Sequence, residues 1–168
     1  SLTIEDLEVV GVDTFAGLPL ITAKKARIDV GFWSVVGGDG NYNIDEVVLD
    51  EPFINLKVLT AELANYLIVP VAESGTPEPE TAAATAQINL SRYEVINGHF
   101  IYDDRTTETY LEITGLNTTG DGDFTSTIFD LDTHSDAKSL TLKQAGVTYL
   151  NEVKAKADAL VSIDLNQS

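Results

Sequence analysis

The alternation of apolar and polar residues over long stretches constrains the fold of this chain more than any other feature. It is clearest over residues 153–165, where every second residue is apolar and most of those between are charged or polar. A helix would bring Lys154 and Asp158 into the apolar stripe, so the pattern predicts a strand. Its length of about 13 residues exceeds the usual 3 to 10. The predicted apolar side consists of Val153, Ala155, Ala157, Ala159, Val161, Ile163 and Leu165.

The same period of two recurs in residues 26–32 and 52–58 and, in shorter form, over much of the rest of the chain. Strands with one apolar face are typical of antiparallel sheets. We therefore predict a mainly β fold with a long, curved, open antiparallel sheet, in the form of a β-groove or partial barrel. Few short helices are expected, with residues 60–68 as one candidate and a turn near Ser34 as another.

One segment, residues 72–87, differs in composition from the rest. It reads AESGTPEPETAAATAQ and contains no large apolar residue. Such a segment is typical of a flexible linker or a long loop. It divides the chain into an N-terminal β unit, residues 1–71, and a C-terminal β unit, residues 88–168, which we expect to continue the same sheet.

Charge and composition exclude several classes of protein. The formal net charge is −17, well beyond the roughly 2 to 8 that suffices for a small soluble domain. A chain this acidic is repelled by phosphate backbones, so no nucleic-acid partner is expected. The absence of cysteine excludes disulfides and thiolate metal sites. Because the chain begins at Ser1 and contains no Met, we expect it to be a segment of a longer protein.

Residues suited to catalysis are scarce. The two histidines, His99 and His134, lie near no nucleophile motif. His99 follows the turn residues Asn97 and Gly98, which predicts a partly exposed histidine on a strand edge. Acidic pairs are numerous but expected by chance among 27 Asp and Glu residues. We therefore predict neither an enzyme nor a cofactor.

A calcium loop is a further hypothesis for residues 39–50. Counted from Asp39, the oxygen-bearing residues fall at positions 1, 3, 5, 7 and 12 of an EF-hand loop. Ile44 occupies the position that requires Gly, and position 12 lacks the longer Glu, so solvated turn acids are the favoured interpretation. Residues 121–132 imitate the pattern with the same defects. The weak metal candidates are Asp39, Asn41, Asn43, Asp45 and Asp50.

The motifs NIDEVVLDEPFINL (residues 43–56) and INLSRYEVINGHFIYDD (residues 88–104) follow one another in an order that resembles the AsmA family of Gram-negative envelope proteins. NIDEVVLDEPFINL is similar to the family's "I..I.LD.P.I.L" strand, and residues 2–36 resemble the unit that precedes it. INLSRYEVINGHFIYDD is similar to "I.L..Y.I.NG.I.Y.D", and residues 115–165 resemble the section that follows. Thr60-Ala61-Glu62-Leu63 departs from the usual Asp-Gly before Ala-Asn-Tyr. The family's N-terminal membrane anchor is not among these residues.

The resemblance implies a periplasmic segment of a protein anchored in the inner membrane, with a role in outer-membrane assembly and a β-groove that carries or shields lipid. Implied partners are a phospholipid or other lipid and outer-membrane assembly components. The alternation independently predicts an apolar sheet face that must be covered, and small alanines would suit a groove floor. The groove candidates are the 153–163 apolar residues named above together with Ile54 and Leu56. The alternative is a β-rich interaction module, calcium-dependent or not.

Overall fold

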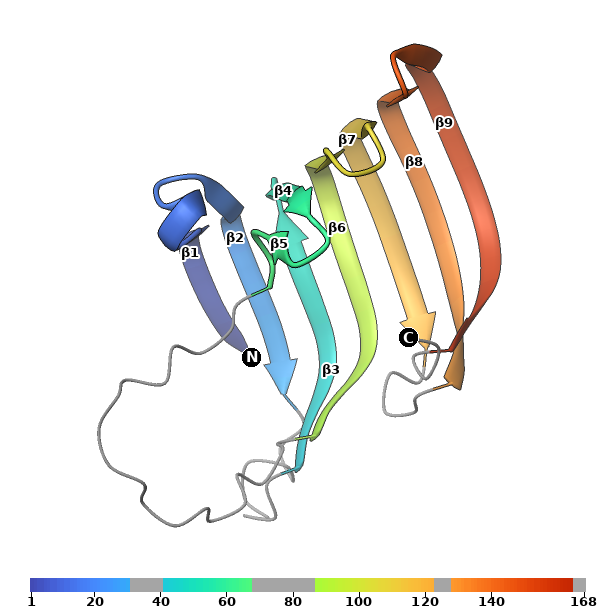
Figure 1. Cartoon of the computed structure of the whole chain (residues 1–168). Coiled ribbons are helices and arrows are strands. Elements are labelled where there is room, and N and C mark those ends of the chain that lie inside the picture. Colours follow the sequence, from blue (N-terminus) through green and yellow to red (C-terminus); the bar gives the residue numbers. More distant parts are fainter. Residues whose placement is uncertain (31–40, 68–86, 123–127, 165–168) are drawn as a thin grey trace, which may run out of the picture.

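The computed structural model describes residues 1–30, 41–67, 87–122 and 128–164. These residues form one nine-stranded sheet and a single 3-10 turn, Asp13–Phe15, with no α-helix. The prediction of a mainly β, open and curved sheet is confirmed (Figure 1). The strands are β1 Leu2–Val10, β2 Pro19–Val30, β3 Asn41–Asp50, β4 Phe53–Thr60, β5 Leu63–Ala64, β6 Gln87–Asp104, β7 Thr109–Gly122, β8 Ile128–Gln144 and β9 Val147–Asp164.

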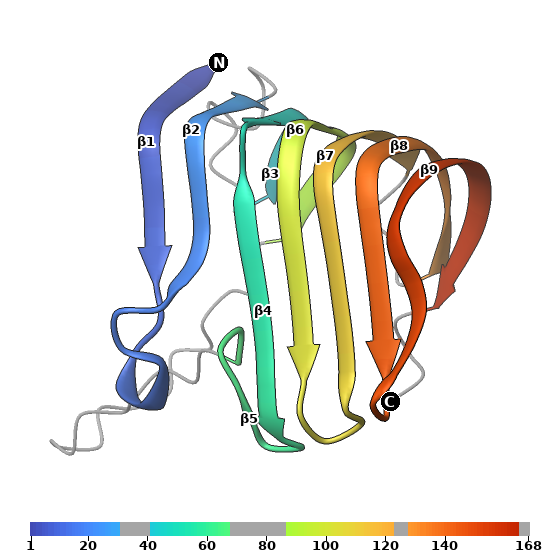
Figure 2. The same ribbon diagram turned by 90° about the horizontal axis from the view of Figure 1, so that it is seen from above.

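The sheet is mostly antiparallel but contains a parallel seam. Both β3 and β4 run parallel to β6, with Asp50 opposite Ile96 and Phe53 opposite His99. The register is therefore continuous across Glu51 and Pro52, so β3 and β4 act as one long strand between β2 and β6 (Figure 2). All other pairings between the named strands are antiparallel. This parallel seam joins strands that precede residues 68–86 in the sequence to strands that follow them, so both belong to one sheet.

A transverse crease crosses the long strands. Along each long strand, every second residue lies on the same face of the sheet. At one point in each strand, the next residue on that face is three positions farther along the chain instead of two. In β7 the step runs from Ile113 to Leu116, and both side chains line the same hollow. Pairing registers extend the step across the sheet, and Pro52 and Val95 both lie beside Gly98. The other steps are Ile4 to Leu7, Ala23 to Ala26, Leu49 to Pro52, Val95 to Gly98, Ala137 to Leu140, and Leu150 to Val153.

Register shifts of the β-bulge type mark the step between β6 and β7 and between β8 and β9, whereas β1 and β2, and likewise β7 and β8, make the step together without a register shift. Backbone φ is positive at the extra positions Asp6, Glu51, Asn97, Gly115 and Glu152. A bulge bends its strand and lets side chains three apart share a face. Because the three-residue steps lie on neighbouring strands, these strands bend together, and Figure 2 shows the long strands curving over instead of running straight. The crease therefore curves the sheet while keeping one face continuous.

Three local predictions are corrected. Residues 60–67 of the expected helix form the last residue of β4, the strand β5 and turns. The Asn65 side chain binds the β4 backbone there: its Oδ1 accepts from Lys57 N at 2.8 Å and its Nδ2 donates to Asn55 O at 2.6 Å. Asn97 and Gly98 form a bulge inside β6 instead of a turn between strands. Gln87 belongs to β6. The turn near Ser34 and residues 72–86 of the expected linker lie outside the described residues.

Candidate functional site

Two rows of large apolar side chains cross the sheet between the crease and the β8–β9 turn. Residues directly opposite one another on paired strands share a face, so the pairing registers define each row. We call these the apolar rows. The first consists of Ile21, Ile54, Phe100, Ile113, Leu140 and Val153, and the second of Leu56, Tyr102, Leu111, Leu142 and Leu150.

The same face continues beyond the crease with smaller residues. Leu116 and Ala137 connect the first apolar row to Ala155 and Ala157 on β9, and together they line a hollow of about 130 Å³. Farther along, the registers place Val95, Thr118, Ser135 and Ala157 side by side, followed by Tyr93, Gly120, Thr133 and Ala159. We call the apolar rows and this continuation the apolar face.

The apolar face has no second layer over it in the described part of the chain. All strands there belong to one sheet and no α-helix is present. Among the described side chains, only Pro52 is fully buried. At the β9 end Leu150 is 39%, Val153 37% and Val161 43% exposed. A sheet whose large apolar side chains stay half-exposed still has apolar area to bury.

Hydroxyl groups on the small-residue half of the apolar face satisfy one another. Thr118 Oγ1 lies 2.7 Å from Ser135 Oγ, and Tyr93 Oη lies 3.3 Å from Thr133 Oγ1. Thr118 and Thr133 are 3.4 Å apart through their hydroxyl oxygens. Hydroxyls paired in this way present less unsatisfied polarity to an apolar ligand than isolated ones. This half therefore differs from the apolar rows in that it carries paired hydroxyl groups and several small side chains.

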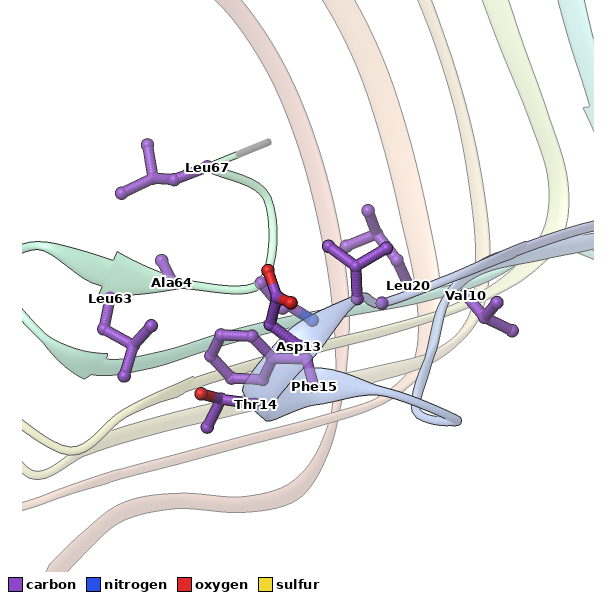
Figure 3. A pocket seen from close by; sticks show the side chains of 11 residues that line it. Val10, Asp13, Thr14, Phe15, Leu20, Leu63, Ala64 and Leu67 are labelled. Carbon is purple, nitrogen blue, oxygen red and sulfur yellow. The ribbon is translucent and has the colours of Figure 1, made fainter. Parts of the chain in front are cut away.

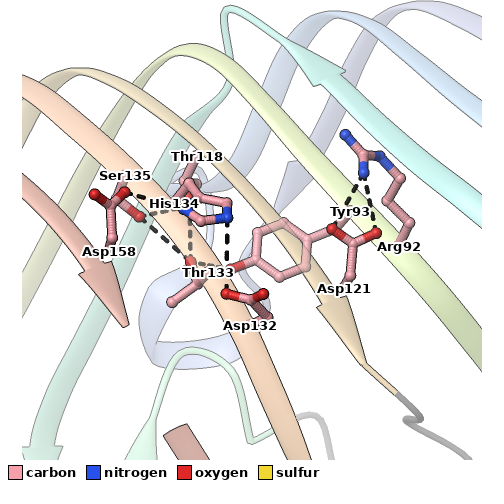
Figure 4. A network of polar contacts seen from close by, with 9 residues as sticks. All are labelled: Arg92, Tyr93, Thr118, Asp121, Asp132, Thr133, His134, Ser135 and Asp158. Atoms are coloured by element: carbon pink, nitrogen blue, oxygen red, sulfur yellow. Dashed lines mark hydrogen bonds and ion pairs between the residues drawn. The ribbon is translucent and has the colours of Figure 1, made fainter. Parts of the chain in front are cut away.

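The opposite face is charged. Arg27 donates to Glu46 at 2.9 Å, and Arg92 connects Glu46 at 3.1 Å with Asp121 at 3.0 Å. Farther along, His134 Nδ1 lies 3.0 Å from Asp158 and His134 Nε2 lies 3.7 Å from Asp132 (Figure 4). The hydrogen bond to Asp158 and the negative charge of Asp132 raise the pKa of His134 above 6.5. The sheet therefore has one apolar and one ionic side.

His99 also lies on the charged face. His99 Nε2 is 2.8 Å from Glu112 Oε1, and the hydroxyl of Tyr110 donates to Glu112 Oε2 at 3.0 Å. The hydrogen bond from His99 lowers the pKa of Glu112, and burial of the carboxylate opposes it. The His99 side chain is 39% exposed, as expected, but the prediction of a strand edge is wrong, because His99 lies within β6 and pairs with Phe53 on β4 and Thr114 on β7. These contacts occupy both carboxylate oxygens of Glu112.

The structure brings the sequence-predicted groove residues onto one face. Val153, Ala155, Ala157, Ala159 and Val161 follow one another along β9, and Ile54 and Leu56 belong to the first and second apolar rows through β4. Ile54 and Val153 lie in the same row. The Ile163 backbone pairs with Phe129 in β9 and β8, and its side chain lies outside the described residues.

Sequence reasoning missed most of the apolar rows. Phe100, Ile113, Leu140 and Leu142 are not among the predicted groove residues, although they form the centre of both rows. The missing sequence feature was the step of three. Apolar pairs such as Ile113 with Leu116, or Ala137 with Leu140, break strict alternation because a bulge separates them.

The weak metal candidates do not form a loop. Asn41–Asp50 is the continuous strand β3, and ten residues of strand extend about 33 Å, so they do not wrap around a cation as an EF-hand loop does. Asp39 and the side chains of Asn41 and Asn43 lie outside the described residues. Within the described ranges, no group of three or more His, Asp or Glu residues is placed to hold a metal ion.

A second, smaller hollow lies beside the 3-10 turn. It has a volume of about 80 Å³, and its lining includes Val10, Phe15, Leu20, Leu63 and Leu67 (Figure 3). Phe15 is 5% exposed and joins the end of β1 to β5. Ligand pockets usually measure about 300 to 1,000 Å³. We therefore assign this hollow to the packing of one end of the sheet.

Comparisons with known proteins identify no relative: no family model, no curated protein and no solved structure matches this chain. Within the described residues, no helix is long and apolar enough to cross a membrane.

Proposed function

We propose that this chain is a non-enzymatic, periplasmic segment of an AsmA-like envelope protein, and that its apolar face carries or shields lipid during outer-membrane assembly. The observation that supports this most strongly is a continuous apolar face without a second layer among the described residues. The motif resemblance supplies the compartment, the membrane-anchored parent protein and the assembly partners, which the apolar face alone does not indicate.

The dimensions of the apolar rows suit an acyl chain. The first row joins Ile21 on β2 to Val153 on β9 through five strand spacings, which amounts to about 24 Å. Burial of one methylene contributes about 0.8 kcal/mol, so a dozen give on the order of 10 kcal/mol before ordering costs. A lipid tail lying along this row would therefore bind without any polar contact.

Both histidines contact carboxylates on the charged face. In the described contacts His99 pairs with Glu112, and His134 pairs with Asp158 and Asp132, all on the charged face. A hydrolase of the triad type needs a hydroxyl or thiol nucleophile hydrogen-bonded to its histidine. Neither histidine has such a partner among these contacts.

A second candidate is a protein-interaction module. The exposed apolar side chains of β9 favour it, since Tyr149 is 62% and Leu160 72% exposed. Large apolar side chains outside the apolar face are typical of surfaces that contact protein. In this alternative a partner protein contacts the side of β9 on which Tyr149 and Leu160 lie.

Binding of a fluorescent phospholipid to paired variants tests the proposal. Leu140→Asn places an amide in the first apolar row, whereas Ser139→Asn places the same amide on the charged face one residue away. We expect Leu140→Asn to reduce phospholipid binding at least several-fold and Ser139→Asn to leave it near the wild-type level. Equal binding by all three proteins, or no binding by the wild type, would contradict the lipid role.

A further inference from the structure

The strand β9 lies at one edge of the sheet. In the described part of the chain it pairs only with β8, so its other side presents unpaired backbone N–H and C=O groups (Figure 1). An edge of this kind can pair with another strand. Its apolar side chains are also exposed, from 37% at Val153 and 43% at Val161 to 72% at Leu160.

We propose that β9 pairs with β9 of a second copy of this chain, antiparallel and centred on Ala157. A two-fold axis perpendicular to the sheet would place Ala157 opposite itself and keep the apolar faces of both copies on the same side. On that face Val153 lies opposite Val161, and Ala155 opposite Ala159. Small residues at the centre let the two backbones approach without collision.

The charges of β9 fit this register. On the charged face Lys156 of one copy lies opposite Asp158 of the other, twice by symmetry. Within each copy Lys156 is already opposite Asp136 and Asp158 is opposite His134. A row of alternating charge would therefore run from β8 of one copy to β8 of the other. Neither Lys154 nor Lys156 takes part in an ion pair among the described residues.

The neighbouring registers are less favourable. Pairing centred on Lys156 would set two lysines opposite each other, and pairing centred on Asp158 would set two carboxylates opposite each other. Like charges directly opposite across strands are destabilising. The register centred on Ala157 also places Leu160 opposite Lys154, whose aliphatic stem can cover it while the ammonium stays in water.

This pairing would extend the apolar face across both copies, since the two sheets would become one. The proposal does not require lipid, because it rests on the edge of β9 and its side chains. It can therefore fail while the lipid role holds, and the reverse is also true.

Charge exchange tests the register. Sedimentation equilibrium of the full chain at about 0.15 M salt, where repulsion beyond about 8 Å is screened, should show a concentration-dependent dimer. Lys156→Asp and Asp158→Lys each set like charges opposite and should weaken the dimer about tenfold, whereas the double exchange should restore it. Lys25→Asp changes the net charge as Lys156→Asp does but lies on β2, far from β9 in the strand order, so it serves as the matched control and should leave the dimer unchanged.

Cross-linking gives a second test, because the chain contains no cysteine. Ala157→Cys would place the two thiols opposite each other, about 5 Å apart at Cβ, near the spacing a disulfide needs. Val161→Cys lies on the same face, but the two copies of that residue would be about 27 Å apart. We expect disulfide dimers from Ala157→Cys alone. A monomer at about 100 μM, equal cross-linking of both variants, or no rescue by the double exchange would overturn the proposal.

Discussion

The ring of Tyr93 lies directly over Gly120 on the neighbouring strand, where any Cβ would collide with its Cε1 and Cζ atoms. The two residues are register partners on β6 and β7. An aromatic ring over a cross-strand glycine covers the backbone that the missing side chain leaves bare. The contact lies on the apolar face and brings the Tyr93 hydroxyl to Thr133, one strand beyond Gly120.

Gly120→Ala should destabilise the protein because the ring of Tyr93 must move. Overpacking of this kind costs about 1 to 3 kcal/mol in the free energy of unfolding, to be measured by urea denaturation. Thr119→Ala, on the opposite face of the same strand, should cost less than about 1 kcal/mol. Equal effects of the two substitutions would show that the Tyr93 contact contributes nothing specific.

Alanine substitution at two glycines of similar backbone conformation tests whether the crease in β7 requires a residue without a side chain. Gly115 in β7 has φ +59° and Gly146 in the β8–β9 turn has φ +76°, so alanine is strained at both. Only at Gly115 would the new Cβ collide with Lys138, at 2.5 Å from its Cδ. We expect Gly146→Ala to cost about 1 kcal/mol and Gly115→Ala about 1 to 3 kcal/mol more. Equal losses would mean that the bulge tolerates a side chain.

The sequence predicts those parts of the fold in which apolar residues occupy every second position. Every second residue from 153 to 161 is apolar, and β9 forms as expected with these residues on one face. The crease was not predictable in the same way. Asp6, Glu51 and Asn97 adopt positive φ, yet acidic and amide side chains at such positions do not separate a bulge from a turn.

Two other features depend on contacts distant in sequence. The parallel pairing of β3 and β4 with β6 joins residues 46 positions apart, such as Asp50 with Ile96, and no local pattern specifies that neighbour. Residues 60–67 have a composition that permits a helix, but Asn65 binds the backbone of β4 instead. The sequence therefore predicts the residues of the apolar face on β4 and β9, but it does not predict those on the strands between them, β6, β7 and β8.

Asp104 should make stability depend on acid pH. Hydrogen bonds from the Thr106 hydroxyl at 2.6 Å and the Thr106 and Thr107 amides lower its pKa from 3.8 to about 2. Because the folded pKa is depressed, the stabilisation is present above pH 3.8 and is lost as pH falls through about 2. The difference in unfolding free energy between wild type and Asp104→Asn should shrink over this window. A difference independent of pH would contradict the assignment.

The stabilisation that His134 provides should depend on pH in the opposite direction. Since Asp158 and Asp132 raise its pKa above 6.5, its stabilisation is complete below pH 6.5 and is lost as pH rises through the higher folded pKa. Wild type should exceed His134→Gln in unfolding free energy by more at about pH 5.5 than at about pH 8.5. An NMR titration of His134 at or below 6.5 would contradict this.

Photocross-linking at two adjacent residues of β7 tests the lipid role most directly. Ile113 lies in the first apolar row, and Glu112 lies on the charged face with His99 and Tyr110. A photoreactive benzoyl-phenylalanine replaces each residue in turn, and the protein is irradiated with phospholipid vesicles and analysed by mass spectrometry. We predict phospholipid adducts from position 113 and few or none from position 112. Equal adducts from both positions, or none from position 113, would contradict a lipid-binding apolar face.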